Sequence, residues 1–180
     1  VLKLNFVDKL LEDLLSTEIL GIAYCVGSID IKPLRLTKTK DFVSSYVLNL
    51  VSAADIIRTF QDNLKRNSGS VVLFSTVAAK KGFVNHSIIS SAKAGIEGFT
   101  RAFAREVSDF NIRVNCIAPG PINTDLIKGV SEDQINKIID QQIIRKQYST
   151  EDVCDLVEIL LDEKSSSLSA VESSLYFLIR

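Results

Sequence analysis

The chain has 180 residues, of which 46% are hydrophobic and 24% charged, as expected for one soluble globular domain. Its 21 basic and 22 acidic residues nearly cancel, which argues against a nucleic-acid-binding surface and against an acidic disordered tail. The three cysteines are scattered, and there is one histidine, so the common zinc sites and a disulfide framework are excluded. We expect a cytoplasmic protein that holds no metal and has no membrane or nucleic-acid partner.

The first half of the chain alternates short apolar runs with amphipathic stretches. Its predicted elements are, in chain order, a strand at 1–6, a helix of about two turns after Asp8, a buried strand at 22–26, a loop at 28–40 and a long helix at 41–64. Apolar residues of that long helix recur at alternating spacings of three and four, and Asn67-Ser68-Gly69 is expected to end it.

The second half continues the alternation. Its predicted elements are a strand at 71–74, a long helix at 87–108, a strand at 112–118, helices at 131–143 and 150–162, and a last strand at 173–179. Continuous apolar strands that alternate with helices are typical of βαβ units, so we predict an α/β fold with a parallel sheet covered on both faces. Ligands of such sheets bind at the carboxyl ends of the strands. Those ends are expected near Gly27, near Ser75 and Thr76, and near Pro119-Gly120.

Several segments point to a known family. They are YCVG at 24–27, LNL at 48–50, VVLFST at 71–76 with the helix sequence SAKAGIEGFTRAFARE at 91–106, and IRVNCIAPGPINT at 112–124. In this order and at these spacings they resemble the short-chain dehydrogenase/reductase family. The resemblance implies one Rossmann-like domain over residues 1–180, with a doubly wound parallel sheet. It also implies that the family's first βαβ unit, about fifty residues with a glycine-rich pyrophosphate-binding turn, precedes Val1.

The resemblance further implies a function. It predicts an oxidoreductase that uses NAD or NADP and acts on a small-molecule carbonyl/alcohol pair. The alternative is a catalytically inactive relative, which would keep the fold to bind a ligand or a partner.

Three positions match catalytic residues of the family. Asn49 matches an asparagine that holds a proton-relay water, Thr76 (or Ser75, after a one-residue gap) matches a hydroxyl that binds the substrate carbonyl, and Lys93 matches a lysine that binds the nicotinamide ribose. Without the resemblance, Asn49 would be interpreted as a satisfied buried amide. Ser75 and Thr76 would then simply close a turn, and Lys93 would be a solvated surface charge.

The family's catalytic tyrosine has no counterpart, because Ile89 stands four residues before Lys93. Reduction of a carbonyl needs a proton donor, and the loss of a general acid costs about 10²–10⁴-fold in rate. His86 lies at the start of the same predicted helix and titrates in a suitable range. His86 or a water molecule is therefore the expected donor, although an ordinary helix-start role for His86 remains open.

Other positions match the family's cofactor contacts. They are Asn5 at the adenine, Cys25 and Gly27 after the strand at 22–26, Lys93 at the ribose, and Pro119, Gly120, Ile122 and Thr124 around the nicotinamide. Without the resemblance, the segment that begins with Pro119-Gly120 would be interpreted only as a sharp turn.

The two long helices carry apolar or small residues outside their main apolar stripe. These are Val43, Val47, Val51 and Ala54 on helix 41–64, and Ala94, Ala102 and Ala104 on helix 87–108. A helix that is apolar over much of its circumference is buried on two sides. We therefore predict a homodimer or homotetramer built on these helices, which is also common in the family. The alternative is a monomer in which a segment before Val1 covers these residues.

Overall fold

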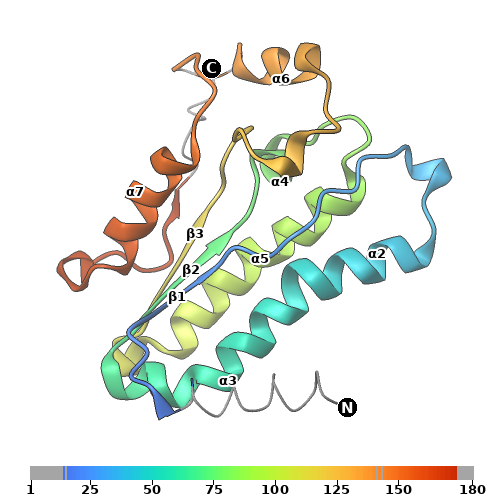
Figure 1. Cartoon of the computed structure of the whole chain (residues 1–180). Coiled ribbons are helices and arrows are strands. Elements are labelled where there is room, and N and C mark those ends of the chain that lie inside the picture. Colours follow the sequence, from blue (N-terminus) through green and yellow to red (C-terminus); the bar gives the residue numbers. More distant parts are fainter. Residues whose placement is uncertain (1–13, 15, 141, 143, 174–180) are drawn as a thin grey trace.

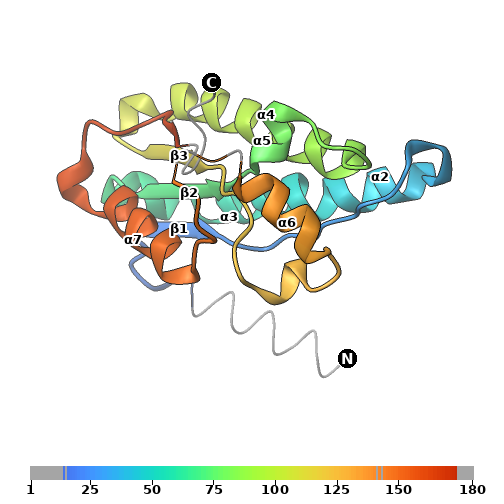
Figure 2. The same ribbon diagram turned by 90° about the horizontal axis from the view of Figure 1, so that it is seen from above.

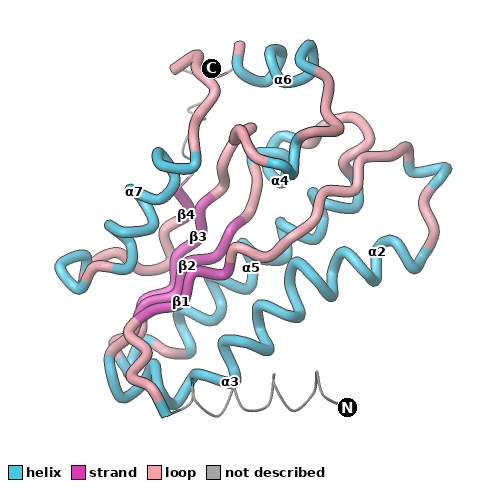
Figure 3. Tube along the Cα trace, in the orientation of Figure 1, coloured by secondary structure: helices cyan, strands magenta, loops and turns pink. Residues whose placement is uncertain are grey.

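Four parallel strands form the centre of the part of the chain described by the computed structural model, which covers residues 14, 16–140, 142 and 144–173. The strands are β1 (Gly21–Tyr24), β2 (Ser70–Phe74), β3 (Arg113–Ile117) and β4 (Glu172–Ser173), and they lie side by side in that order (Figure 3). Gly21 pairs with Ser70, and Ser70 pairs with Arg113. The predicted parallel α/β fold is confirmed.

Helices cover both faces of this sheet (Figures 1 and 2). On one face, α3 (Ser52–Asn67) and α5 (Ser87–Glu106) pack against a cluster that includes Val71, Leu73 and Val114. On the other face, α7 (Thr150–Leu161) packs through Leu160 against Val72 and Ile117. β2 and β3 are buried along nearly their whole length, which explains their continuous apolar sequences.

The first long helix contains a feature that its spacing did not predict. It consists of α2 (Thr39–Tyr46), a π-helical turn η2 (Val47–Val51) and α3. The Tyr24 hydroxyl donates a hydrogen bond of 2.9 Å to the Leu48 carbonyl and so ties this turn to β1. Single π-turns are frequent at functional sites. The helix runs from Thr39 to Asn67, two residues before and three residues beyond its predicted bounds, and it ends at the predicted stop signal with Ser68 in the left-handed conformation at φ 49°.

Several predicted bounds need correction. The strand predicted at 22–26 is β1 at 21–24, and Val26 is 52% exposed because the chain has already left the sheet there. The helix predicted at 131–143 is α6 (Glu132–Ile139), which ends four residues earlier. The short helix α4 (Val77–Lys81) was not predicted, because five residues carry no periodicity. Ala104 was expected on the outer side of its helix but is buried against the sheet.

The other described elements agree with their predictions. α5 ends two residues before the predicted bound, and α7 begins at the predicted cap, where Ser149 and Asp152 form a capping box. Short 3-10 turns lie at Leu34–Leu36, Ser108–Phe110, Asp125–Ile127 and Glu163–Ser165. The predicted strand at 1–6, the helix after Asp8 except for Leu14 and Ser16, and all but the first residue of the strand at 173–179 lie outside the described residues. Within the described residues, the helices are too short or too polar to cross a membrane.

Candidate active site

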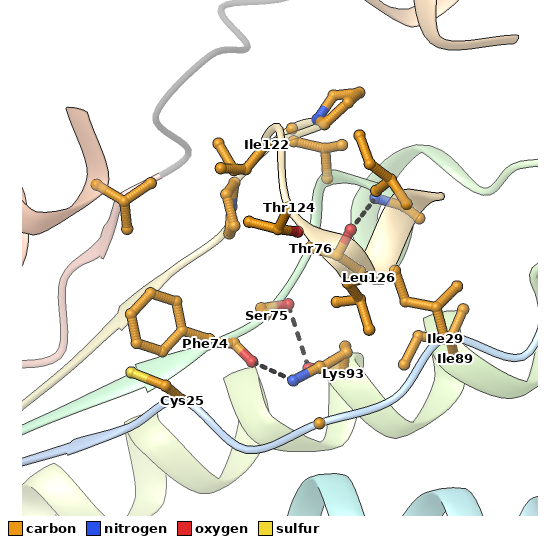
Figure 4. A pocket seen from close by; sticks show the side chains of 18 of the residues that line it. Cys25, Ile29, Phe74, Ser75, Thr76, Ile89, Lys93, Ile122, Thr124 and Leu126 are labelled. Carbon is orange, nitrogen blue, oxygen red and sulfur yellow. Dashed lines mark hydrogen bonds between the residues drawn. The ribbon is translucent and has the colours of Figure 1, made fainter. Parts of the chain in front are cut away.

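A cavity of about 940 Å³ opens at the carboxyl ends of the strands. Its walls come from the segments that follow β1, β2 and β3, from the first turns of α5, and from α6 and α7 (Figure 4). The cavity lies at the carboxyl ends of the parallel strands, where the sequence analysis predicted a ligand site. It gathers nearly every site residue singled out in the sequence, namely Cys25, Gly27, Asn49, Ser75, Thr76, His86, Lys93, Pro119, Gly120, Ile122 and Thr124. Asn5 lies outside the described residues.

Lys93 is a half-buried cation of this cavity. It stands on α5, and its Nζ donates a hydrogen bond of 2.8 Å to the carbonyl of Phe74 at the end of β2. Burial lowers the pKa of Lys93 from 10.5 to about 8, while the sulfurs of Cys116 and Cys25 act in the opposite direction. The Lys93 amine therefore exchanges its proton near pH 8, whereas a solvated lysine does so near pH 10.5.

Asn49 and Gly27 shape the space beside Lys93. The Asn49 side chain is buried in the π-turn η2, and its Nδ2 donates to the Ser45 carbonyl at 3.0 Å. Its Oδ1 has no hydrogen-bond partner among the described residues. A Cβ added to Gly27 would stand 2.8 Å from Asn49 Oδ1 and 3.4 Å from Lys93 Nζ. One acceptor and one donor therefore face the same small space, which only glycine leaves open.

Ser75 and Thr76 have different surroundings. The Ser75 hydroxyl donates to Glu97 Oε1 at 2.7 Å, and both side chains are buried. Its proton is thereby engaged within the protein. Thr76 Oγ1 accepts a hydrogen bond of 3.3 Å from the Ala78 backbone as the N-cap of α4, which leaves its own proton available to a ligand. This geometry favours Thr76 over Ser75 as the hydroxyl that binds a substrate.

Ile89 and His86 lie on the first turns of α5. Ile89 is one turn before Lys93, is 2% exposed, and contributes to the cavity wall. His86 caps the helix, and its Nδ1 lies 2.8 Å from the Val84 carbonyl. Because a carbonyl accepts hydrogen bonds, Nδ1 is the donor in this contact. The ring packs edge-on against Phe83 at 5.5 Å between centroids.

The loop after β3 is held by the segment that precedes α7. Ile122 forms an isolated parallel bridge with Tyr148, and the Asn123 amide donates to the Tyr148 carbonyl at 3.3 Å. Tyr148 is buried, and burial raises the pKa of its hydroxyl. Ile122 and Thr124 therefore enter the cavity from a fixed loop.

Most of the remaining wall is apolar, and sequence analysis did not assign these residues to a site. They are Ile29, Ile31, Phe83, Leu126, Ile127, Val130, Ile135, Ile138, Val153 and Val157. A weak signal was present, since Ile135, Ile138 and Ile139 give α6 an amphipathic pattern. Periodicity indicates an apolar face, but it does not tell whether that face covers a core or a cavity.

Comparison with known proteins places the chain in a family. A family model described as enoyl-(acyl carrier protein) reductase matches residues 5–173. Carbonyl reductase family member 4 of Xenopus laevis is 34% identical over 123 residues, which cover 66% of this chain and 52% of that protein. The 3-oxoacyl-[acyl-carrier-protein] reductase of Homo sapiens is 36% identical over 104 residues, which cover 57% and 44%. The chain thus spans about half the length of the curated relatives it matches.

Solved structures support the fold. The 3-oxoacyl-[acyl-carrier protein] reductase of Brucella melitensis superposes with a TM-score of 0.84 at 21% identity, covering 93% of this chain and 66% of that one. A short-chain type dehydrogenase/reductase of Mycobacterium ulcerans gives a TM-score of 0.84 at 20% identity, covering 91% and 62%. At these identities the likeness establishes the Rossmann-like fold alone.

Proposed function

The chain belongs to the short-chain dehydrogenase/reductase family, and from this premise we propose that its cavity interconverts a carbonyl compound and the corresponding alcohol with a nicotinamide dinucleotide. The observation that carries the proposal is the placement of Lys93 Nζ and Asn49 Oδ1 on the space beside Gly27. A cationic donor and an unpaired acceptor suit a ribose hydroxyl or a water molecule, and neither suits a purely structural cavity.

The residues present fit the nicotinamide end of such a cofactor. Lys93 would donate to the ribose, Gly27 admits close approach, and Ile122 and Thr124 would contact the carboxamide. When bound, the dinucleotide supplies the hydride.

The substrate end of the cavity is assigned to an apolar carbonyl compound. Thr76 has a proton available to donate to the carbonyl oxygen, which would stabilise the charge that develops there on reduction. The walls on α6 and α7 are branched aliphatic residues such as Ile135, Ile138 and Val157, which favour hydrocarbon substituents. The names of the relatives, carbonyl reductase and 3-oxoacyl-[acyl-carrier-protein] reductase, agree with such substrates.

The proton for the product alcohol needs a source other than residue 89. We assign it to a water molecule held between Asn49 Oδ1 and Lys93 Nζ, because these two atoms face one space and Lys93 has a pKa of about 8. His86 is the second candidate, since it lines the same cavity. Replacing His86 by Gln separates the two, because only a direct donor role for histidine predicts a loss of turnover on the order of 10².

Ligand binding without turnover is the second candidate function, and Ile89 favours it. An isoleucine cannot transfer a proton, and Ile89 fills the cavity wall one turn before Lys93. A chain that binds nucleotide and carbonyl compound without reducing the latter would match this function.

Fluorescence titration with NADPH and with NADH, followed by a ketone assay, distinguishes these functions. The oxidoreductase predicts enhanced nucleotide fluorescence on binding and its decay when an apolar ketone is added. Binding without decay supports the second function. If neither NADPH nor NADH binds, both the oxidoreductase and the nucleotide-binding function without turnover are overturned.

A further inference from the structure

We propose that Lys93 is also a nucleophilic amine, which reacts with apolar aldehydes in the cavity to form an imine. This chemistry goes beyond the proposed oxidoreductase, because it requires neither a nucleotide nor a proton donor at position 89. It would make the cavity a site that captures reactive carbonyl compounds covalently.

The contacts of Lys93 leave its amine available for this reaction. The one hydrogen bond that it donates among the described residues goes to a backbone carbonyl, that of Phe74, at 2.8 Å. No carboxylate within the described residues forms an ion pair with Lys93. The nearest acid along α5, Glu97, instead accepts the Ser75 hydroxyl at 2.7 Å. A lysine without a carboxylate partner in an apolar wall is the usual setting of an imine-forming lysine.

The absence of a side chain at Gly27 leaves room beside the Lys93 amine for a carbonyl group to approach. Gly27 has no side chain, and a Cβ added at this position would stand 3.4 Å from Lys93 Nζ. Figure 4 shows the Lys93 amine directed toward the Phe74 carbonyl, with Ile29 and Ile89 on the opposite side of the Lys93 side chain. The cavity as a whole is lined largely by branched aliphatic side chains, which favour a hydrocarbon chain on the aldehyde.

Burial favours a neutral Lys93 amine against the charged and titratable groups around the cavity. They are Cys25 after β1, Cys116 on β3, Glu97 on α5, His86 at the α5 cap, and Cys154, Glu158 and Asp162 on or after α7. Of these, only the two sulfurs of Cys25 and Cys116 act on Lys93, and burial outweighs them, so that the pKa of Lys93 is lowered to about 8. A sizeable fraction of the amine is thus unprotonated at physiological pH.

The reaction balances without any further reagent. The protonated amine first gives one proton to solvent, and its lone pair then forms a C–N bond to the aldehyde carbon. As the carbinolamine forms, one proton moves from the nitrogen to the carbonyl oxygen, and Thr76 can donate a hydrogen bond to that oxygen. A second proton, taken back from solvent, converts the hydroxyl into water, which leaves, and the nitrogen keeps one hydrogen in the protonated imine. The net change is amine plus aldehyde to imine plus water, with no oxidation or reduction.

Trapping with hexanal and sodium cyanoborohydride in the absence of nucleotide tests the proposal. The reductant fixes the imine as a hexyl-amine, which peptide mass spectrometry locates. At pH 7.5 we expect Lys93 to be modified at least about 10-fold faster than Lys137, because burial increases the neutral fraction of the Lys93 amine. Lys137 is the matched reference because it is exposed on α6 and paired with Asp133 at 2.7 Å. Modification at equal or lower rate than at Lys137 overturns the proposal.

Two further comparisons test the origin of the reactivity. Glyceraldehyde, which is polar, should modify Lys93 with much less preference over Lys137, and an equal preference for both aldehydes would contradict the role of the apolar walls. Lys93→Arg keeps the charge and should abolish the adduct in this peptide, whereas Lys137→Arg should leave the Lys93 adduct unchanged. If Lys93→Arg does not fold, the relative modification of Lys93 and Lys137 in the chain without substitutions still tests the proposal.

The outcome is separable from that of the oxidoreductase. Trapping at Lys93 without nucleotide binding supports the imine and contradicts the oxidoreductase. Nucleotide binding and ketone reduction without trapping support the oxidoreductase and contradict the imine. If both hold, NADPH should protect Lys93 from hexanal, because the ribose and the aldehyde would compete for one amine.

Discussion

Lys93 is the residue on which both proposals for the cavity depend. It combines a single hydrogen bond to the Phe74 carbonyl with a pKa lowered by burial. In the proposed function this amine is a donor to the ribose. A charged donor of this kind contributes about 1.5–3 kcal/mol, so its removal has a measurable effect on binding.

Lys93→Ala should therefore weaken nucleotide binding by about 10–100-fold. The measurement is the same fluorescence titration, made in parallel on Lys137→Ala, whose side chain is exposed on α6. The second variant should bind like the unmodified chain. If both variants bind the nucleotide with equal affinity, Lys93 does not contact the nucleotide.

The same lowered pKa predicts a pH dependence of stability. Folded Lys93 loses its proton near pH 8, whereas an unfolded lysine loses it near 10.5. Between these values the unfolded chain binds more protons, so the free energy of unfolding should rise with pH. The rise due to Lys93 is on the order of 3 kcal/mol.

Urea unfolding at several pH values between 7 and 10.5 measures this effect. Lys93→Met is the reference, because it keeps the volume and has no proton to lose. Relative to that variant, the unmodified chain should gain stability across the window. A constant difference between the two would show that Lys93 is solvated.

Ile89→Tyr tests the proton source. A tyrosine at this position would place a phenol one helical turn before Lys93, where a general acid contributes about 10²–10⁴-fold. We expect carbonyl reduction to increase by at least about 10-fold, measured as nucleotide oxidation with an apolar ketone. A folded variant without any gain would mean that the cavity geometry does not allow proton delivery from residue 89.

Some candidate site residues could be predicted from the sequence, and others could not. Asn49 and Lys93 were identified because their neighbours in the chain match family motifs. Sequence alone left Ser75 and Thr76 as alternatives, because a one-residue gap exchanges them. The hydrogen bond from Ser75 to Glu97, 22 positions apart, and the N-cap bond that Thr76 accepts distinguish the two in the structure.

At the scale of elements, α7 is held to the sheet by donors from β2 and β3. The Arg113 guanidinium donates to the carbonyls of Leu160 at 2.6 Å and Asp162 at 3.0 Å, and Ser70 Oγ donates to Leu160 at 2.8 Å. These bonds satisfy carbonyls that end the helix, which have no partners within it. Because α7 forms one wall of the cavity, this cap also positions the site.

Arg113→Met should destabilise the chain by about 3 kcal/mol, because buried carbonyls at the end of α7 lose charged donors. Urea unfolding measures the loss, and Arg113→Lys should recover part of it by keeping one cationic donor. If Met and Lys behave alike and both cost little, solvent rather than Arg113 caps the helix.

The elements whose sequence has a clear period were predicted well. The spacing of Ile89, Ala92 and Ile96 indicated α5, and Ser149 marked the start of α7. The π-turn η2 was missed, because one inserted residue changes the helix geometry without disturbing the apolar spacing over a short window. α4 was missed because its start depends on a side-chain cap by Thr76 rather than on a pattern.

At the scale of the whole molecule, we propose a homodimer or homotetramer in which the long helices meet. The outer side of α2 and η2 exposes Val43, Val47 and Val51 at 56%, 48% and 45%. Exposed apolar side chains along one helix face mark an interaction surface. Ala94 and Ala102 of α5 are also exposed, so small residues allow a second copy to approach.

Val47→Lys should shift the assembly toward the monomer, because a charge would be buried at the interface between copies. Sedimentation at micromolar concentration measures the mass. Ile159→Lys is the control, since it changes a similarly exposed apolar residue on α7, across the sheet. A monomer mass for the unmodified chain would contradict the assembly.

The central claim is that the cavity reduces carbonyl compounds with a nicotinamide, and transfer of a labelled hydride tests it most directly. The chain is incubated with an apolar ketone and NADPH or NADH that carries deuterium at the transferring position of the nicotinamide. Mass spectrometry then determines whether the alcohol contains that deuterium. The account predicts an alcohol with one deuterium on the carbinol carbon, formed by the unmodified chain and lost in Lys93→Ala. Bound nucleotide with no deuterated alcohol, under conditions where a reductase of known activity yields it, would contradict the account.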